Sequence, residues 1–167
     1  RVALLAEREG IFDVSCQAKV EFGGKTIQPP MAMWKAFAPR RGGVLAVCEK
    51  GRVRMENERI RAWLKEKGAT LAIEDAASGE SLAVSSAAIG PPSQPNEWRA
   101  LTFQLACQTR DGQAAAEAWA ESKRHPGLIF RRRIVLGADS IVRIEHIVEN
   151  RSAAPVRAKI EQTLQTE

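Results

Sequence analysis

Apolar and polar residues alternate along most of this chain, and the clearest alternation runs from Leu128 to Leu164. Because successive side chains of a β-strand point to opposite faces, this period of two indicates strands with one buried face. Turn-forming residues interrupt it at 137–140 and at 150–155. The segment therefore predicts a meander of three strands. One face of the middle strand is predicted to carry Val142, Ile144, His146 and Val148.

Residues 11–28 are predicted to form a hairpin. An apolar face alternates with a polar one, and Gly23-Gly24 makes a two-residue turn that permits positive φ at both central positions. Pro29-Pro30 ends the return strand. Residues 31–43 contain aromatic side chains, among them Trp34, together with proline and glycine. We interpret this segment as a loop that carries aromatic residues.

Residues 58–67 fit either a helix or a strand. Asn57 is suited to cap a helix and Gly68 to end it, whereas the alternation of apolar and charged residues favours a strand. The same choice arises at 113–123, where alanines that favour a helix by propensity alternate with larger side chains. We predict strands in both segments, because the neighbouring segments are strands and tertiary context often overrides propensity.

Three prolines between Gly90 and Asn96 prevent regular strand pairing there. This loop would suit a linker between two lobes, but the patterns on its two sides match, so we expect one domain over residues 1–167. A chain of this length can bury roughly two thirds of its unfolded surface. About ten or more short strands with closely spaced turns predict an all-β fold, an antiparallel β-sandwich.

The net charge of +5 is modest and is spread along the chain, apart from Arg131-Arg132-Arg133 and Pro39-Arg40-Arg41. Nucleic-acid binding normally shows a denser basic face with aromatic residues among the charges, so no nucleic-acid partner is expected. No apolar run approaches the about 20 residues that a membrane-spanning helix needs, so no membrane partner is expected either. The sequence begins at Arg1 without a secretion signal, so we expect a processed protein or part of a larger one, and the compartment is not indicated.

Cys16, Cys48 and Cys107 are too few and too scattered for a disulfide framework or a zinc site. Each lies in an apolar strand pattern, so we expect buried free thiols. The chain shows no serine elbow, glycine-rich phosphate loop, CxxC pair or cluster of carboxylates. We therefore expect no metal, no cofactor and no catalytic residue.

Two stretches of the sequence carry short motifs in a recognisable order. The first contains Glu56-Asn57, then Lys67-Gly68-Ala69-Thr70-Leu71, then a turn with Asp75, Ser78 and Gly79. The second contains the strand 142–148, followed by Glu149-Asn150 and Pro155. This order resembles the galactose-mutarotase-like supersandwich, which is found in aldose epimerases and in β-sandwich domains of glycoside hydrolases and polysaccharide lyases. The resemblance covers residues 50–165, and it implies a supersandwich-like fold and an association with carbohydrate.

The chain also departs from that family. Full supersandwich enzymes are much longer, and their active site resembles a pair of histidines with a carboxylate base. Here only His125 and His146 are present, and neither matches the family's histidines. His146 alternates with Glu145 along a strand, so the two side chains point to opposite faces. We expect a hydrogen-bonded core or edge histidine, and we favour the absence of catalysis in this chain alone.

Tryptophans are the best candidates for ligand binding. Trp63 and Trp119 fall on the polar side of their predicted strands, whereas Trp34 and Trp98 lie in or beside predicted loops. An exposed indole offers a flat apolar plate and one N–H donor, which suits the C–H face of a sugar ring. The alternative is that these rings pack under loops or against another domain.

The arginine run supplies the polar candidates. Arg131 and Arg133 would share one face of a strand while Arg132 points away. Guanidinium groups can hold an acidic sugar or a phosphate through paired hydrogen bonds, although a solvated sheet surface is the simpler explanation. If sugar binds, we expect the concave face of a sheet to be lined by ligand-binding residues. The candidates are Trp63, Trp119, Arg131, Arg133 and Trp34.

The expected function is a carbohydrate-associated β-sandwich domain, either sugar-binding or accessory to a glycan-active enzyme. One alternative is a structural or protein-interaction module, in which the same side chains meet a homo-oligomer partner or a flanking domain. A second alternative is a reduced aldose-epimerase-like enzyme.

Overall fold

The computed structural model describes residues 10–16, 20–22, 25–27, 32–38, 43–90, 97–156 and 159–166, with side chains from residue 43 onward except at 89 and 90. The chain divides into two compact units, Arg1–Arg40 and Arg41–Glu167. The β-sandwich lies within the second unit. The expectation of one domain over residues 1–167 stays a prediction.

In the described residues of the first unit, four strands form two antiparallel pairs. In the shorter pair, β2 (Val20–Phe22) lies beside β3 (Lys25–Ile27), and the end partners Phe22 and Lys25 flank Gly23-Gly24, which confirms the predicted hairpin over residues 20–27 only. The glycines themselves lie outside the described residues. In the longer pair, β1 (Gly10–Cys16) lies beside β4 (Ala32–Ala38).

Strand β4 corrects the prediction of a loop at 31–43. All seven of its residues have a partner on β1, from Cys16 opposite Ala32 to Gly10 opposite Ala38. A continuous ladder satisfies the backbone polar groups of both strands, and this tertiary pairing outweighs the proline and glycine that flank the segment.

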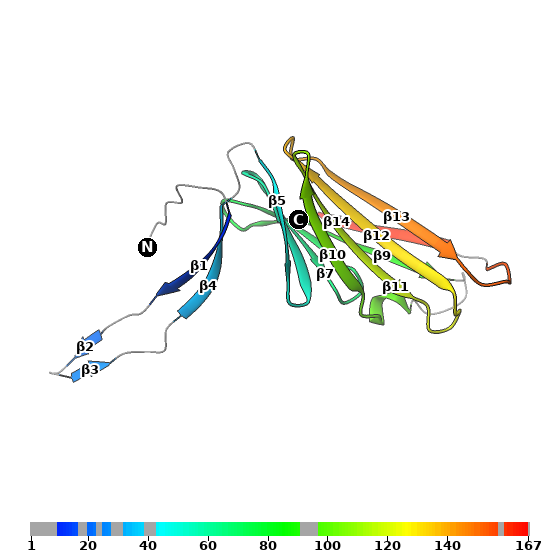
Figure 1. Ribbon diagram of the computed structural model, residues 1–167, viewed down its shortest axis with the longest axis horizontal. Coiled ribbons are helices and arrows are strands. Elements are labelled where there is room, and N and C mark those ends of the chain that lie inside the picture. The colour runs from blue at the N-terminus through cyan, green and yellow to red at the C-terminus, as the bar shows by residue number, and fades with distance from the viewer. Residues whose placement is uncertain are drawn as a thin grey trace. The chain divides into compact units, whose positions relative to one another are not determined.

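The second unit is built from two antiparallel sheets (Figure 1). The six-stranded sheet has the order β14-β9-β8-β7-β6-β5. Its strands are β5 (Leu45–Glu49), β6 (Arg52–Glu56), β7 (Ile60–Lys65), β8 (Leu71–Asp75), β9 (Ser81–Gly90) and β14 (Lys159–Thr166).

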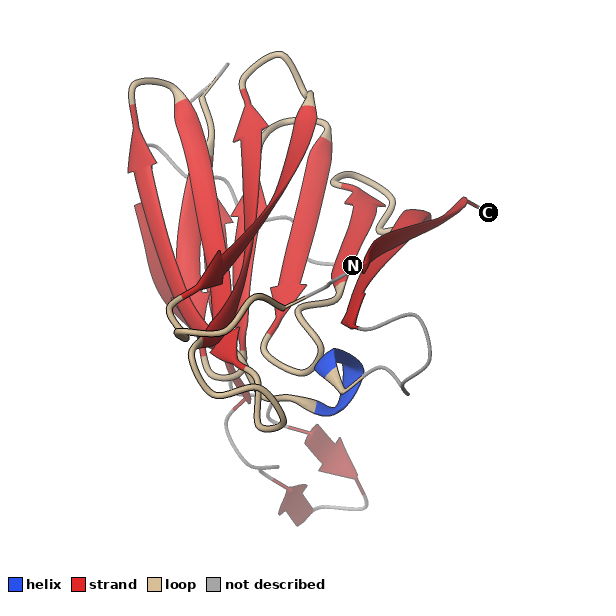
Figure 2. Ribbon diagram, turned by 90° about the vertical axis from the view of Figure 1, so that its right-hand side faces the viewer, coloured by secondary structure: helices blue, strands red, loops and turns tan. Residues whose placement is uncertain are grey.

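The four-stranded sheet has the order β10-β11-β12-β13. Its strands are β10 (Gln104–Arg110), β11 (Gln113–Glu121), β12 (Leu128–Gly137) and β13 (Val142–Asn150). Apart from the short 3-10 helix η1 (Trp98–Ala100), the described residues form strands and turns (Figure 2). The all-β antiparallel sandwich is confirmed, and both ambiguous segments are strands, β7 and β11.

The hydrophobic core lies between the two sheets. The alanines that made β11 look helical form its inner face, and Ala114, Ala116 and Ala118 are all buried. The larger core side chains are fully buried and come from both layers; they include Met55, Leu64, Leu71, Phe130, Ile134 and Leu136. Alternation along each strand therefore assigns one set of residues to the core and the other to solvent.

Trp98 follows the alternative given for the tryptophans, in which the ring packs inside the protein. It lies beside a proline-rich segment, yet only 2% of its surface is exposed. Its ring packs edge-on against Phe130, with the ring centroids 5.3 Å apart, and lies 6.2 Å from that of Phe103. The helix η1 places this indole in the core, so Trp98 is a packing residue.

Strand β14 corrects the predicted meander. β12 and β13 pair as expected, but β14 belongs to the other sheet, where it pairs with β9 from Gly90 opposite Lys159 to Ala83 opposite Thr166. Alternation predicts which face of a strand is apolar, but it does not specify the neighbouring strand. β14 is an edge strand, and its apolar side chains stay open, with Ile160 45% and Leu164 57% exposed.

Two of the motif residues have structural roles. The side-chain amide of the buried Asn57 donates to the carbonyl of Gly137, 3.0 Å away, and so joins the six-stranded sheet to a turn of the other sheet. Its oxygen accepts from the N–H groups of Arg59 and Ile60. Gly68 has φ of +65°, and a Cβ there would lie 3.0 Å from the carbonyl oxygen of Arg99, so this turn requires glycine.

In the described part of the chain, no helix has the length and apolarity needed to cross a membrane.

Candidate ligand-binding site

The structure separates the predicted ligand-binding residues. Trp119, Arg131 and Arg133 lie on the outer face of the four-stranded sheet, opposite the buried alanines of β11. Trp63 lies between the buried Ala62 and Leu64 on β7, so it belongs to the outer face of the six-stranded sheet. The two outer faces point in opposite directions, so the expectation that Trp63 and Trp119 line one concave sheet is wrong. Trp34 lies on β4 of the first unit, and its side chain is outside the described residues.

Strand register places three complementary side chains in one row. Trp119 on β11 has Gln104 of β10 as its partner on one side and Arg131 of β12 on the other. Directly opposed residues of neighbouring strands have their Cβ atoms about 4.5–5.5 Å apart, so the amide, the indole and the guanidinium adjoin. The row thus combines an apolar plate with hydrogen-bonding groups at both edges.

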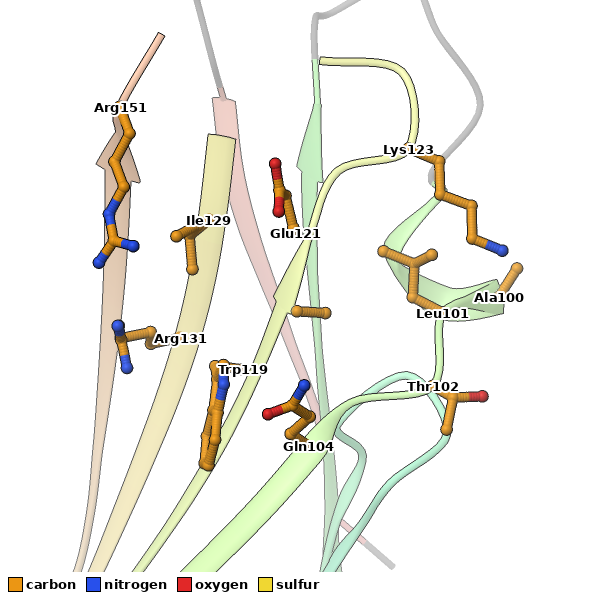
Figure 3. A pocket seen from close by; sticks show the side chains of 11 residues that line it. Ala100, Leu101, Thr102, Gln104, Trp119, Glu121, Lys123, Ile129, Arg131 and Arg151 are labelled. Atoms are coloured by element: carbon orange, nitrogen blue, oxygen red, sulfur yellow. The ribbon is translucent and has the colours of Figure 1, made fainter. Parts of the chain in front are cut away.

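This row forms one wall of a pocket of about 420 Å³ (Figure 3). Figure 3 shows Gln104 and Arg131 on either side of Trp119, with Glu121 and Lys123 farther along the β11 side. The rest of the lining comes from Ala100 and Leu101 at the end of η1, and from Thr102, Ala120, Ile129 and Arg151. Sequence reasoning found Trp119 and Arg131 but missed Gln104, Glu121, Lys123 and Arg151. Their grouping depends on strand register, which the alternation does not specify.

A chain of ion pairs fixes the arginines of this pocket. Arg131 lies 3.2 Å from Glu117 and 3.7 Å from Glu149, measured between guanidinium nitrogen and carboxylate oxygen. Arg151 also binds Glu149, at 2.8 Å. The hydrogen bond from Arg151, followed by the charges of Arg151 and Arg131, lowers the pKa of Glu149. Glu149 therefore stays ionised well into mildly acidic solution, which keeps both guanidinium groups in place.

Arg133 lies farther along β12 and lines a different hollow. That hollow has a volume of about 190 Å³ and is formed by β10 and β11 together with Arg133. Arg133 is 3.6 Å from Glu145, its cross-strand partner on β13. Arg131 and Arg133 therefore share a face, as predicted, but not a pocket.

Trp63 has a covered ring. The guanidinium carbon of Arg52 lies 4.0 Å from its ring centroid, and that of Arg54 lies 5.3 Å away. Glu56 binds Arg54 at 2.8 Å and Arg61 at 2.8 Å, which orders this cluster. A guanidinium over an indole face is a favourable cation–π contact, and it occupies the surface that a sugar ring would need.

Arg132 and His146 lie between the sheets. Arg132 points away from the face of Arg131 and Arg133, as predicted, but its burial corrects the expectation of a solvated surface for the whole arginine run. Arg132 is 0% exposed and donates to the carbonyls of Ala69 and Ser85 at 2.6 and 3.0 Å, and to the Ser85 hydroxyl at 2.6 Å. Burial lowers its pKa to about 10. These bonds go to neutral groups, so the charge is held without a carboxylate among them.

His146 is the hydrogen-bonded histidine that we expected. Its Nε2 lies 2.9 Å from Oε1 of Gln162, and its ring stacks on Phe130. Burial lowers its pKa, the bond to Gln162 opposes that shift, and the charge of Arg132 adds to it. Its described partners include no carboxylate, so the arrangement lends no support to an acid–base pair at His146.

Nothing in the described residues forms a group of three histidine, cysteine or acidic side chains that could hold a metal ion. Comparisons of the chain with models of known families, with curated proteins and with solved structures find no match. The resemblance to the galactose-mutarotase-like family therefore stays a prediction.

Proposed function

We propose that this chain binds carbohydrate in the pocket beside Trp119, as a non-catalytic module or as an accessory to a glycan-active enzyme. The observation that carries the proposal is the row Gln104–Trp119–Arg131, which lines a pocket of about 420 Å³. That volume falls within the roughly 300–1,000 Å³ typical of small-molecule sites.

The chemistry of the row suits a sugar. An indole offers apolar area to the C–H face of a pyranose ring, and its N–H can reach a hydroxyl. Gln104 can both donate and accept, Arg131 donates, and the carboxylate of Glu121 accepts, so hydroxyl groups at the ring edge find partners of both kinds. Among the described residues no cation lies over the ring of Trp119, in contrast to Trp63.

Calorimetric titration with a panel of mono- and oligosaccharides tests the proposal. We expect a saturable heat for at least one sugar in the full chain, and an affinity at least tenfold lower in Trp119→Ala. The matched control is Trp63→Ala, which removes an indole from the opposite outer face and is expected to leave the affinity unchanged. Absence of binding across the panel, or equal losses in both variants, would contradict the proposal.

Self-association is a second candidate function, favoured by strand β14. Within the described residues this edge strand pairs with β9 alone and exposes Ile160 and Leu164. An apolar edge strand is a template for pairing with a second copy. Sedimentation velocity should then show a dimer that the double variant Ile160→Lys, Leu164→Lys converts to monomer; a monomer at high concentration in the parent chain would exclude this function.

A further inference from the structure

The two sheets meet along one side of the sandwich at the edge strands β5 and β10. Cα atoms of these strands approach within 8 Å of one another. The N–H of Ala46 on β5 donates to the hydroxyl of Thr109 on β10, with 2.8 Å between nitrogen and oxygen. This bond fixes which residues of the two edges lie across from each other.

The same alignment brings two cysteines together. Cys48 is two residues after Ala46, and Cys107 is two residues before Thr109, so an antiparallel alignment through that bond sets the two cysteines opposite each other. On their own sheets, Cys48 is paired with the buried Val53 and Cys107 with the buried Ala116, so both side chains belong to inner faces. They therefore face each other across the gap between the sheets.

The two thiols are close enough for one to affect the ionisation of the other. Burial, followed by the interaction with the neighbouring Cys48 thiol, raises the pKa of Cys107 to about 12. Cys48 is exposed, because β5 is an edge strand, and this corrects the expectation that its thiol is buried.

We propose that Cys48 and Cys107 form a reversible oxidation site, at which a disulfide links the two sheets of the sandwich. The oxidant is a small-molecule disulfide such as oxidised glutathione. The exposed Cys48 thiolate attacks one sulfur of the oxidant and releases the first small thiol. Cys107, deprotonated as it reacts, then attacks the Cys48 sulfur of the mixed disulfide and releases the second small thiol. The protein loses two protons and two electrons, which the two released thiols carry away.

The exposure of the two sulfurs determines this order of events. Thiol–disulfide exchange requires access to the oxidant and a thiolate. Cys107 is less exposed than Cys48, and its raised pKa disfavours the thiolate. Once the mixed disulfide forms on Cys48, the neighbouring sulfur reacts within the same molecule, so its effective concentration is high. The cross-link closes a long loop that contains β6 to β9, a type of closure that typically stabilises a folded chain.

Peptide mapping tests the site on the full chain. The native protein is equilibrated with oxidised glutathione, remaining thiols are blocked, and a tryptic digest is examined by mass spectrometry. We expect the peptide of residues 42–50 to be linked to that of residues 100–110. In urea, the shorter loop makes a bond between Cys16 and Cys48 the easier closure, so the Cys48–Cys107 link should predominate only in the folded chain.

Two variants complete the test. Cys16→Ser should keep the cross-link and should show a melting temperature about 5–10 °C higher after oxidation than after reduction. Cys107→Ser should instead accumulate glutathione on Cys48. Three outcomes would overturn the proposal: no Cys48–Cys107 link in the oxidised native chain, a link that forms equally well in urea, or a bond from Cys48 to Cys16 that predominates in the folded protein. Each is read from the unsubstituted chain, whether or not the variants fold.

Discussion

The two outer faces of the sandwich carry the same combination of residues in different arrangements. On each face a tryptophan has an arginine as its direct cross-strand partner: Arg54 for Trp63, and Arg131 for Trp119. At Trp63, Arg54 and the nearby Arg52 lie over the ring. At Trp119, Arg131 is held by Glu117 and Glu149, and the ring lines a pocket.

The position of the carboxylates accounts for the difference. Glu56 lies on the same strand as Arg54, and Glu49 binds Arg52, so both guanidinium groups stay near Trp63. Glu117 and Glu149 flank Arg131 from the two neighbouring strands, on either side of β12. A tryptophan among charged residues on the polar side of a strand is therefore not sufficient to predict a binding surface, because the ion pairs decide whether the ring is covered.

The largest expected effect is a loss of stability, and it should distinguish an arginine in the core from its neighbour on the surface. Arg132→Ala should lower the free energy of unfolding by about 3 kcal/mol, because it leaves a cavity and removes three hydrogen bonds inside the core. The neighbouring Arg131→Ala should cost less than about 1 kcal/mol, because its ion pairs are partly exposed. Urea denaturation measures both. Equal losses would mean that the Trp119 face serves the fold rather than a ligand.

The acidic partners of the two faces should also differ. Glu56 is buried and binds two arginines, so Glu56→Gln is expected to lower the free energy of unfolding by about 2–3 kcal/mol. The matched change Glu117→Gln on the other face should cost less than about 1 kcal/mol. Equal shifts of the urea midpoint in the two variants would contradict this difference between the two faces.

A double-mutant cycle measures how firmly Trp63 is covered. Arg52→Ala, Trp63→Ala and the double variant should yield a coupling energy of about 0.5–1 kcal/mol for the cation–π contact. The corresponding cycle for Arg131 and Trp119 should yield a smaller value, since Arg131 is directed toward carboxylates. A coupling energy near zero would indicate that Arg52 does not cover the ring of Trp63.

The smallest expected effect is a pH dependence of the free energy of unfolding, which arises from His146 between the sheets. His146 has a pKa below the unfolded value of about 6.5, so below that pH the unfolded chain takes up a proton first. Stability is therefore complete above pH 6.5 and falls as the pH drops through the folded pKa. Glu149 stays ionised over this range because its pKa is lowered. Urea midpoints at pH 7 and pH 5 should differ less in His146→Gln than in the parent; equal differences would assign the effect elsewhere.

The strands were largely predictable, and their partners were not. Alternation located β7 and β11 despite residues that also suit a helix, because burial of one face leaves a period of two in the sequence. It did not reveal that β4 pairs with β1, that β14 joins the other sheet or that η1 buries Trp98. Those outcomes depend on contacts between distant segments. The site was predictable only in part for the same reason: Trp119 stood out by its type, whereas Gln104 and Arg151 belong to the pocket through register.

The pairing of β14 with β9 also has a consequence for the route by which this chain folds. The strands β10 to β13 are joined as successive hairpins, so that sheet has low contact order and can assemble early. β9 must instead wait for a partner that follows the whole of that sheet in the sequence. During synthesis, one side of β9 therefore remains unpaired on the nascent polypeptide until β14 emerges, and this interval is when pairing with a wrong strand is most probable.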